Sequence, residues 1–105
     1  MHDEGLLQRC LDVLSAQRVS GLRDKNVFGM RGLMRGKQMF AAVGEASIIV
    51  KLTAAEFEAA LEQAGVTRFT PGGQPLGTWV EVREDVIADD PELREWLAAG
   101  LRGIT

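Results

Sequence analysis

Residues 38–57 read QMFAAVGEASIIVKLTAAEF, and this stretch decides the fold. It contains two short apolar runs, 38–43 and 47–52, both rich in residues that favour strands. The three residues between the runs, 44–46, include a glycine and have the length of a hairpin loop. The stretch therefore predicts two antiparallel strands joined by a tight turn.

The start of a helix follows directly. Thr53 and Glu56 have the spacing of a capping box, in which the Thr53 hydroxyl accepts from the Glu56 N–H and the Glu56 carboxylate reaches back. The apolar spacing then predicts a helix over 54–64. Gly65 comes just after the end of this helix, where a residue with a left-handed backbone conformation commonly terminates a helix.

Upstream of this stretch, a third run of strand-forming residues covers 26–34. A turn containing Gly36 separates it from the next strand, so the three runs predict an antiparallel meander. Gly29 and Gly32 lie inside the first run, which indicates a bulge or a close backbone approach there. Before the meander, apolar residues at helical spacing predict an amphipathic helix over 4–18.

Downstream, five of the seven residues in 71–77 are glycine or proline, which predicts a loop. Residues 78–83 alternate apolar and polar side chains and predict a further strand. The last helix is expected to begin at Asp90, as its N-cap, followed by Pro91. Its buried stripe is expected to comprise Leu93, Trp96 and Leu97.

These elements predict one α+β domain over 1–105. We expect an antiparallel sheet of about four strands, the three-stranded meander plus one, with three helices packed mainly on one face. No apolar run approaches the roughly 20 residues that cross a bilayer, and the acidic N-terminus has no apolar signal core after it. A single cysteine fits a reducing compartment, so we expect a cytoplasmic protein without a membrane partner.

The groups that do most protein chemistry are scarce in this chain. There is one histidine, His2, near the chain end, and one cysteine, Cys10, on the apolar side of the first helix. A packed thiol is inert, and one Cys with one His cannot build the usual zinc sites. We therefore expect no catalytic residues, no metal site and no cofactor, and hence no enzyme.

Two glycine-rich segments are candidates for phosphate-binding loops, and neither fits the required pattern. Gly32 and Gly36 are separated by three residues rather than the four of a Walker loop, and Gln38 stands where Ser or Thr should hold magnesium. Residues 71–77 lead into a strand, whereas dinucleotide loops lead into a helix. We interpret the first segment as a hairpin turn. A ligand pocket beneath the 71–77 loop stays an open alternative.

The charge is distributed unevenly along the chain, whose net charge is -3. Residues 1–51 hold eight cations against five carboxylates, and residues 52–105 hold four against ten. The candidate interaction surface lies in the basic part and comprises Arg31, Arg35 and Lys37. This surface could bind phosphates or an acidic partner. The interpretation that we favour is a charged sheet edge that discourages aggregation.

The run Val27–Phe40 resembles the opening of the TfoX/Sxy N-terminal domain, which typically carries a Met-Phe-Gly-Gly motif and a turn with Gly-Lys. Here Val27 and Met30 replace the first and last residues of that motif. Further similarity lies in the strand ending at Lys51 before a helix, in 69–79, and in the closing 90–96, so that it covers about residues 3–102. The resemblance implies structural roles: Phe28 in the core, and Gly29 and Gly36 in backbone turns.

The resemblance further implies a non-enzymatic regulator of competence gene expression that cooperates with a transcription activator. The longer regulators add a C-terminal domain that this sequence does not include. Our main hypothesis is therefore a regulatory or protein-interaction module whose partner is another protein, with a transcription-related protein as one candidate. Homodimerisation through its oppositely charged halves is a further option. The alternatives are direct nucleic-acid binding by the basic meander, and a small-molecule or enzymatic site under the 71–77 loop.

Overall fold

The computed structural model describes residues 2–105 and confirms the α+β class. All strand pairs are antiparallel and form one six-stranded sheet in the order β1-β2-β3-β4-β6-β5. The sheet thus has six strands where about four were expected. In chain order the elements are α1 Glu4–Ala16, β1 Leu22–Val27, β2 Met30–Arg35, β3 Gln38–Val43, β4 Ser47–Lys51, α2 Ala54–Ala60, β5 Val66–Arg68, a short 3₁₀ turn Pro71–Gly73, β6 Trp79–Arg83 and α3 Asp90–Gly103.

Two strands account for the difference. The run expected as one strand over 26–34 is divided, because the chain reverses at Phe28 and Gly29 between β1 and β2. The second addition is β5, which has only three residues and pairs with the edge of β6. Three residues are too few to display the alternation from which a strand is predicted.

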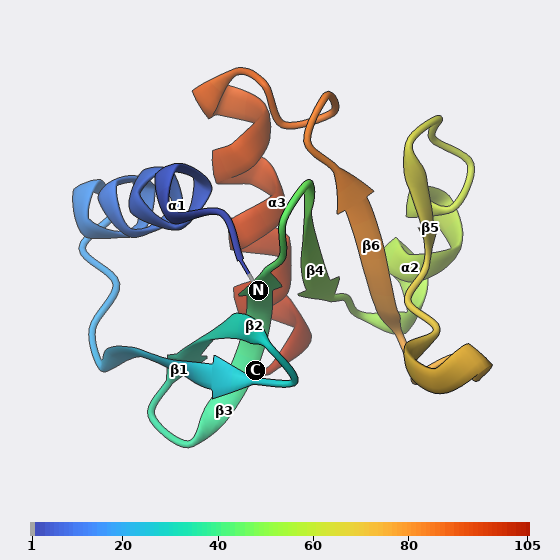
Figure 1. Ribbon diagram of the computed structural model, residues 1–105, viewed down its shortest axis with the longest axis horizontal. Helices are drawn as coiled ribbons and strands as arrows, with labels where there is room; N and C mark the ends of the chain where they lie inside the picture. The colour runs from blue at the N-terminus through green and yellow to red at the C-terminus, as the bar shows by residue number, and fades with distance from the viewer. Residues whose placement is uncertain (1) are drawn as a thin grey trace.

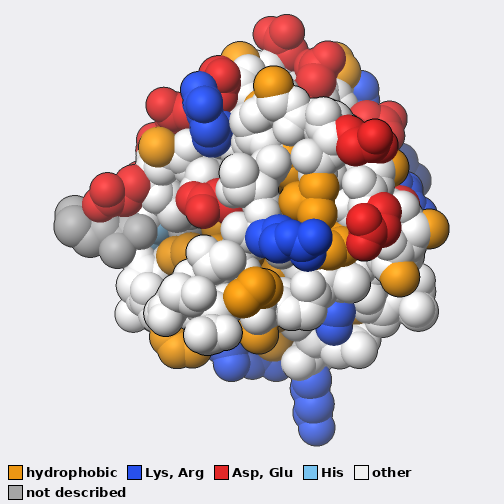
Figure 2. Space-filling model, turned by 90° about the vertical axis from the view of Figure 1, so that its right-hand side faces the viewer, with side chains coloured by type: hydrophobic (Ala, Val, Ile, Leu, Met, Phe, Trp, Pro, Cys, Tyr) orange, Lys and Arg blue, Asp and Glu red, His pale blue; other side chains and the backbone are white. Residues whose placement is uncertain are grey.

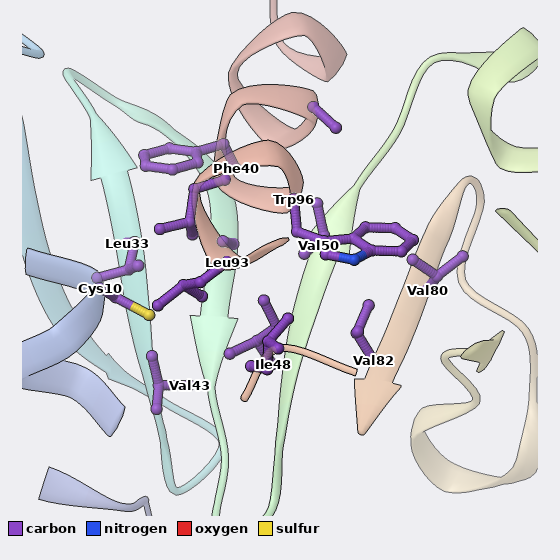
Figure 3. Close-up of a cluster of buried hydrophobic side chains, with 14 of the residues drawn as sticks. Cys10, Leu33, Phe40, Val43, Ile48, Val50, Val80, Val82, Leu93 and Trp96 are labelled. Carbon is purple, nitrogen blue, oxygen red and sulfur yellow. The ribbon is translucent and has the colours of Figure 1, made fainter. Parts of the chain in front are cut away.

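The core lies between the sheet and the helices. Figure 1 shows α3 running along β3 and β4 with α1 beside it, while α2 lies near β5 and β6. In Figure 3, side chains from α1, α3 and the sheet meet, with Trp96 and Leu93 of α3 near Ile48 and Val82 of the sheet. The expected stripe of α3 is buried, with Leu93 and Leu97 fully covered.

Close approach of α3 to the sheet depends on Gly100. A Cβ at this position would lie 2.7 Å from the carbonyl oxygen of Phe40, closer than real Cβ contacts. Phe40 itself has no partner in the register between β2 and β3, which shifts between Leu33 and Met34. This irregularity accompanies the burial of Phe40, whose side chain is fully covered.

The helix ends agree with the sequence in part. Asp3 caps α1 by accepting from the Leu6 N–H at 3.1 Å, and Thr53 caps α2 by accepting from the Glu56 N–H at 3.2 Å. However, α2 ends at Ala60, four residues before the expected end, and α3 has Asp89 as its N-cap in place of Asp90.

Candidate protein-interaction site

The tip of the β1–β2 hairpin is the least expected feature of the molecule. Val27 pairs with Met30, so Phe28 and Gly29 form a two-residue turn. Both have positive φ, 51° for Phe28 and 79° for Gly29, which is the signature of a type I′ turn. The expectation that Phe28 lies in the core is wrong: its side chain is 90% exposed, because the turn projects beyond the last pair of the ladder.

This arrangement is unfavourable twice over. The left-handed region costs an L-residue roughly 1–2 kcal/mol, and a bulky side chain there is an outlier. Within residues 2–105, Arg18 is the only other non-glycine residue with a positive φ. The phenyl ring regains nothing by burial, since it lies in water. Strain of this kind that packing does not explain is a reason to look for function.

A cleft of about 630 Å³ opens on the face of the sheet opposite α3. Ile49 and Glu81 pair across β4 and β6 and alternate with core residues, so their side chains point to this face. Met30, Ile49 and Phe69 supply its apolar lining. Met30 belongs to the pair that closes the hairpin turn, so the exposed tip and the cleft are neighbours.

The rim of the cleft is acidic. It carries Glu45, Glu81, Glu84 and Asp85 against one cation, Arg83. Arg83 donates to both carboxylate oxygens of Asp85, at 3.2 and 3.1 Å, and Glu81 accepts from the Ser47 hydroxyl at 2.7 Å. Within residues 2–105, neither Glu45 nor Glu84 forms an ion pair. The rim therefore favours a cationic partner.

The predicted basic residues do not form one cluster. Arg31 follows the hairpin tip and donates to Asp24 across the hairpin at 2.6 Å. Arg35 lies at the other end of β2, and Lys37 lies in the next turn. The interaction surface as predicted from these three residues stays a prediction. Figure 2, which views the molecule from the side of β5 and α2, shows acidic side chains mainly in the upper half, with basic side chains both among them and projecting below.

The other residues singled out by the sequence have structural roles. Gly36 and Gly65 adopt positive φ, as their turns require. The Glu56 carboxylate reaches back to its cap, where it accepts from the Thr53 hydroxyl at 3.4 Å. It also accepts from Arg102 of α3 at 2.9 and 3.0 Å, and these hydrogen bonds with Arg102 lower the pKa of Glu56. Lys51 ends β4 opposite Trp79.

Cys10 and His2 lie in very different settings. The Cys10 side chain is fully buried, and that burial raises the pKa of its thiol to about 12. His2 lies near the start of α1, with Nε2 at 2.7 Å from Glu4. Over residues 2–105, no group of three or more His, Cys, Asp and Glu side chains is arranged to hold a metal ion.

No residue of the 71–77 loop lines the acidic cleft on the open face of the sheet. A second groove, of about 460 Å³, runs between α2 and α3 over Leu52, Ala60 and Trp96, and it likewise contains no residue of the loop. Residues 71–77 are exposed, and the space around Gly72 and Gly73 is open. The loop extends into solvent rather than covering either hollow.

Sequence reasoning missed both the exposed tip and the cleft. The glycine at position 29 is compatible with a two-residue turn, but the phenylalanine before it favours strands, so the sequence predicts a continuous strand there. The cleft has no local signature, because Met30 lies on β2, Ile49 on β4 and Phe69 just after β5. The acidic residues around position 84 line this hollow next to the basic hairpin, which their local sequence does not indicate.

The fold and this site define a small α+β domain whose exposed hairpin tip adjoins an acidic cleft. A family model described as the TfoX N-terminal domain matches residues 14–104, and the chain belongs to that family. No curated protein and no solved structure matches the chain. In residues 2–105, no helix has the length and apolarity needed to cross a bilayer.

Proposed function

We propose that this chain is a non-enzymatic regulatory module that acts by binding another protein through the tip of its β1–β2 hairpin. Phe28 carries the proposal: it is a large aromatic side chain, 90% exposed, on a backbone conformation that disfavours it. Aromatic anchors of this kind supply much of the binding energy at protein interfaces. Membership of the TfoX N-terminal family supports the regulatory part.

The finer assignment is to regulation of competence genes, with a transcription-related protein as the partner. It rests on the family resemblance. The charge of the hairpin supports a partner with an acidic surface beside an apolar pocket, because β1 and β2 together carry four cations and one carboxylate. Such charges mainly raise the rate of association and select the partner.

Direct nucleic-acid binding is the less favoured alternative. The same four cations would attract phosphates, but the net charge of -3 of the whole chain opposes binding that depends on neutralising many phosphates. An electrophoretic shift assay at low salt separates the two. Binding that weakens steeply with salt and falls when Arg35 and Lys37 are replaced by Ala would favour nucleic acid over a protein partner.

The experiment that tests the proposal is quantitative capture from cells of the native host. Immobilised wild-type chain is compared with Phe28→Asn and with Leu76→Asn, since Leu76 is the other large apolar side chain exposed within residues 2–105, at 45%. We expect a transcription-related protein to be retained by the wild type and by Leu76→Asn, and lost with Phe28→Asn. Equal retention by all three chains would refute the assigned role of Phe28.

A further inference from the structure

We propose that two copies of this chain bind one another by exchanging Phe28, each hairpin tip entering the cleft of the other copy. This inference rests on the proposed function, because both use the hairpin tip as the binding surface. Here the cleft is occupied by the tip of a second copy of the chain. The cleft measures about 630 Å³, within the roughly 300–1,000 Å³ of sites that enclose a small ligand. It has room for a phenyl ring and the narrow turn that carries it.

The lining of the cleft suits an aromatic ring. Phe69 offers a ring for edge-to-face or offset packing, and Met30 offers a thioether, which packs favourably against aromatic groups. Ile49, only 2% exposed, forms an apolar floor. A phenyl ring now in water would therefore be transferred to apolar and aromatic surface.

The charges of the two surfaces are complementary. The β1–β2 hairpin has four cations and one carboxylate, for a net charge of +3. The cleft is lined by four carboxylates and one arginine, for a net charge of -3. Lys25 on β1 and Glu84 at the rim take part in no ion pair within residues 2–105. Docking the tip in a second copy would place these opposite charges near each other.

The position of the tip relative to the cleft favours a closed pair over an open chain. Arg31 pairs with Val43, and Ser47 pairs with Arg83, so the hairpin tip, the β3–β4 turn and the end of β6 lie at one end of the sheet. Donor and acceptor surfaces are therefore adjacent on one side of each copy. A two-fold axis through this side brings both tips to both clefts at once, and such an isologous contact closes on itself.

Sedimentation equilibrium of the purified chain over a wide concentration range tests the exchange. We expect a monomer–dimer equilibrium that weakens as salt is raised. Phe28→Asn should raise the dimer dissociation constant by at least about 10-fold, the effect of removing an interface anchor. Leu76→Asn should leave it unchanged. A chain that stays monomeric up to about 1 mM, or a dimer that Phe28→Asn leaves intact, would overturn the exchange.

A charge swap identifies the surfaces in contact. Lys25→Glu and Glu84→Lys should each dimerise more weakly than the wild type, since each puts like charges together. Mixed in equal amounts, the two variants should form a heterodimer tighter than either homodimer, because opposite charges then meet at both contacts. A mixture no tighter than its components would contradict the geometry.

The self-association and the proposed function fail separately. A monomeric chain that still captures a host protein through Phe28 refutes the exchange and leaves the docking role standing. A Phe28-dependent dimer that captures nothing supports the exchange and refutes the host partner.

Discussion

Val27 on β1 pairs with Met30 on β2, and this pairing obliges the chain to reverse over Phe28 and Gly29 alone. A type I′ turn prefers Asn-Gly at its two central positions. The chain has Phe-Gly, with Phe28 at φ 51°. The hairpin therefore keeps an unfavourable residue at its most exposed point, at the expense of folding stability.

Replacing Phe28 should change folding stability and protein binding in opposite directions. Phe28→Asn should raise the free energy of unfolding by about 1 kcal/mol, since asparagine tolerates the left-handed conformation. In a domain of this size, that corresponds to a rise in Tm of about 4–8 °C. Thermal and urea unfolding measure it, with Leu76→Asn expected to change the unfolding free energy little. At a concentration where both chains are monomeric, a clear loss of stability in Phe28→Asn would mean that the phenyl ring contributes to the fold.

Gly100 should tolerate no side chain. Gly100→Ala places a methyl group against the Phe40 carbonyl oxygen, so it should destabilise by about 1–3 kcal/mol although alanine is the better helix former. Gly5→Ala in α1 is the matched control, because the nearest atom to its new Cβ is the side-chain oxygen of Asp3 at 3.3 Å. It should be neutral or stabilising. Chemical denaturation measures the unfolding free energy of both variants. Equal changes in Gly100→Ala and Gly5→Ala would contradict the close approach of α3 to the sheet.

The Cys10 thiol should be unreactive in the folded protein. Its pKa of about 12 leaves almost no thiolate at pH 8, and the thiolate is the nucleophile. A thiol reagent should label it only at the rate of unfolding, and labelling should become fast in denaturant. Rapid labelling under native conditions would place Cys10 at an accessible surface.

The same shift predicts loss of stability in alkali. The pKa of Cys10 rises from 9.0 to about 12 on folding, so unfolding releases a proton between these values. Stability from this group is complete below pH 9 and falls as the pH rises toward 12. Cys10→Ala should show a smaller slope of unfolding free energy against pH in that range, although it is less stable overall. Parallel curves would show that burial of the thiol is not the cause.

The ion pair between Glu56 and Arg102 predicts an acid effect. The pKa of Glu56 is lowered on folding, so its contribution is present above the ordinary carboxyl pKa and is lost as the pH falls through the folded value. Both groups are partly exposed, so a double-mutant cycle with Glu56→Gln and Arg102→Gln should give about 0.2–1 kcal/mol at pH 7. The coupling should vanish at acid pH. A coupling that persists there would not be electrostatic.

Local patterns predicted most of the fold and little of the site. Helix caps depend on neighbouring residues, so their signals are local, and the cap predicted at Thr53 is confirmed. The turn at Phe28 was missed because a strand-forming residue occupies it. Gly100 is a further local signal, because a glycine inside a helix weakens the helix and indicates a close packing contact. The cleft depends on strand order, which no local pattern contains.

The central claim is that the side chain at position 28 contacts another protein molecule. A photoreactive benzoylphenylalanine placed at position 28, with the same probe at position 76 as control, tests it in the native host. We predict cross-linked species of higher mass at position 28, containing a second copy of the chain or a regulatory partner, and few at position 76. Equal yields at the two positions, or no cross-linked protein at position 28, would contradict the account.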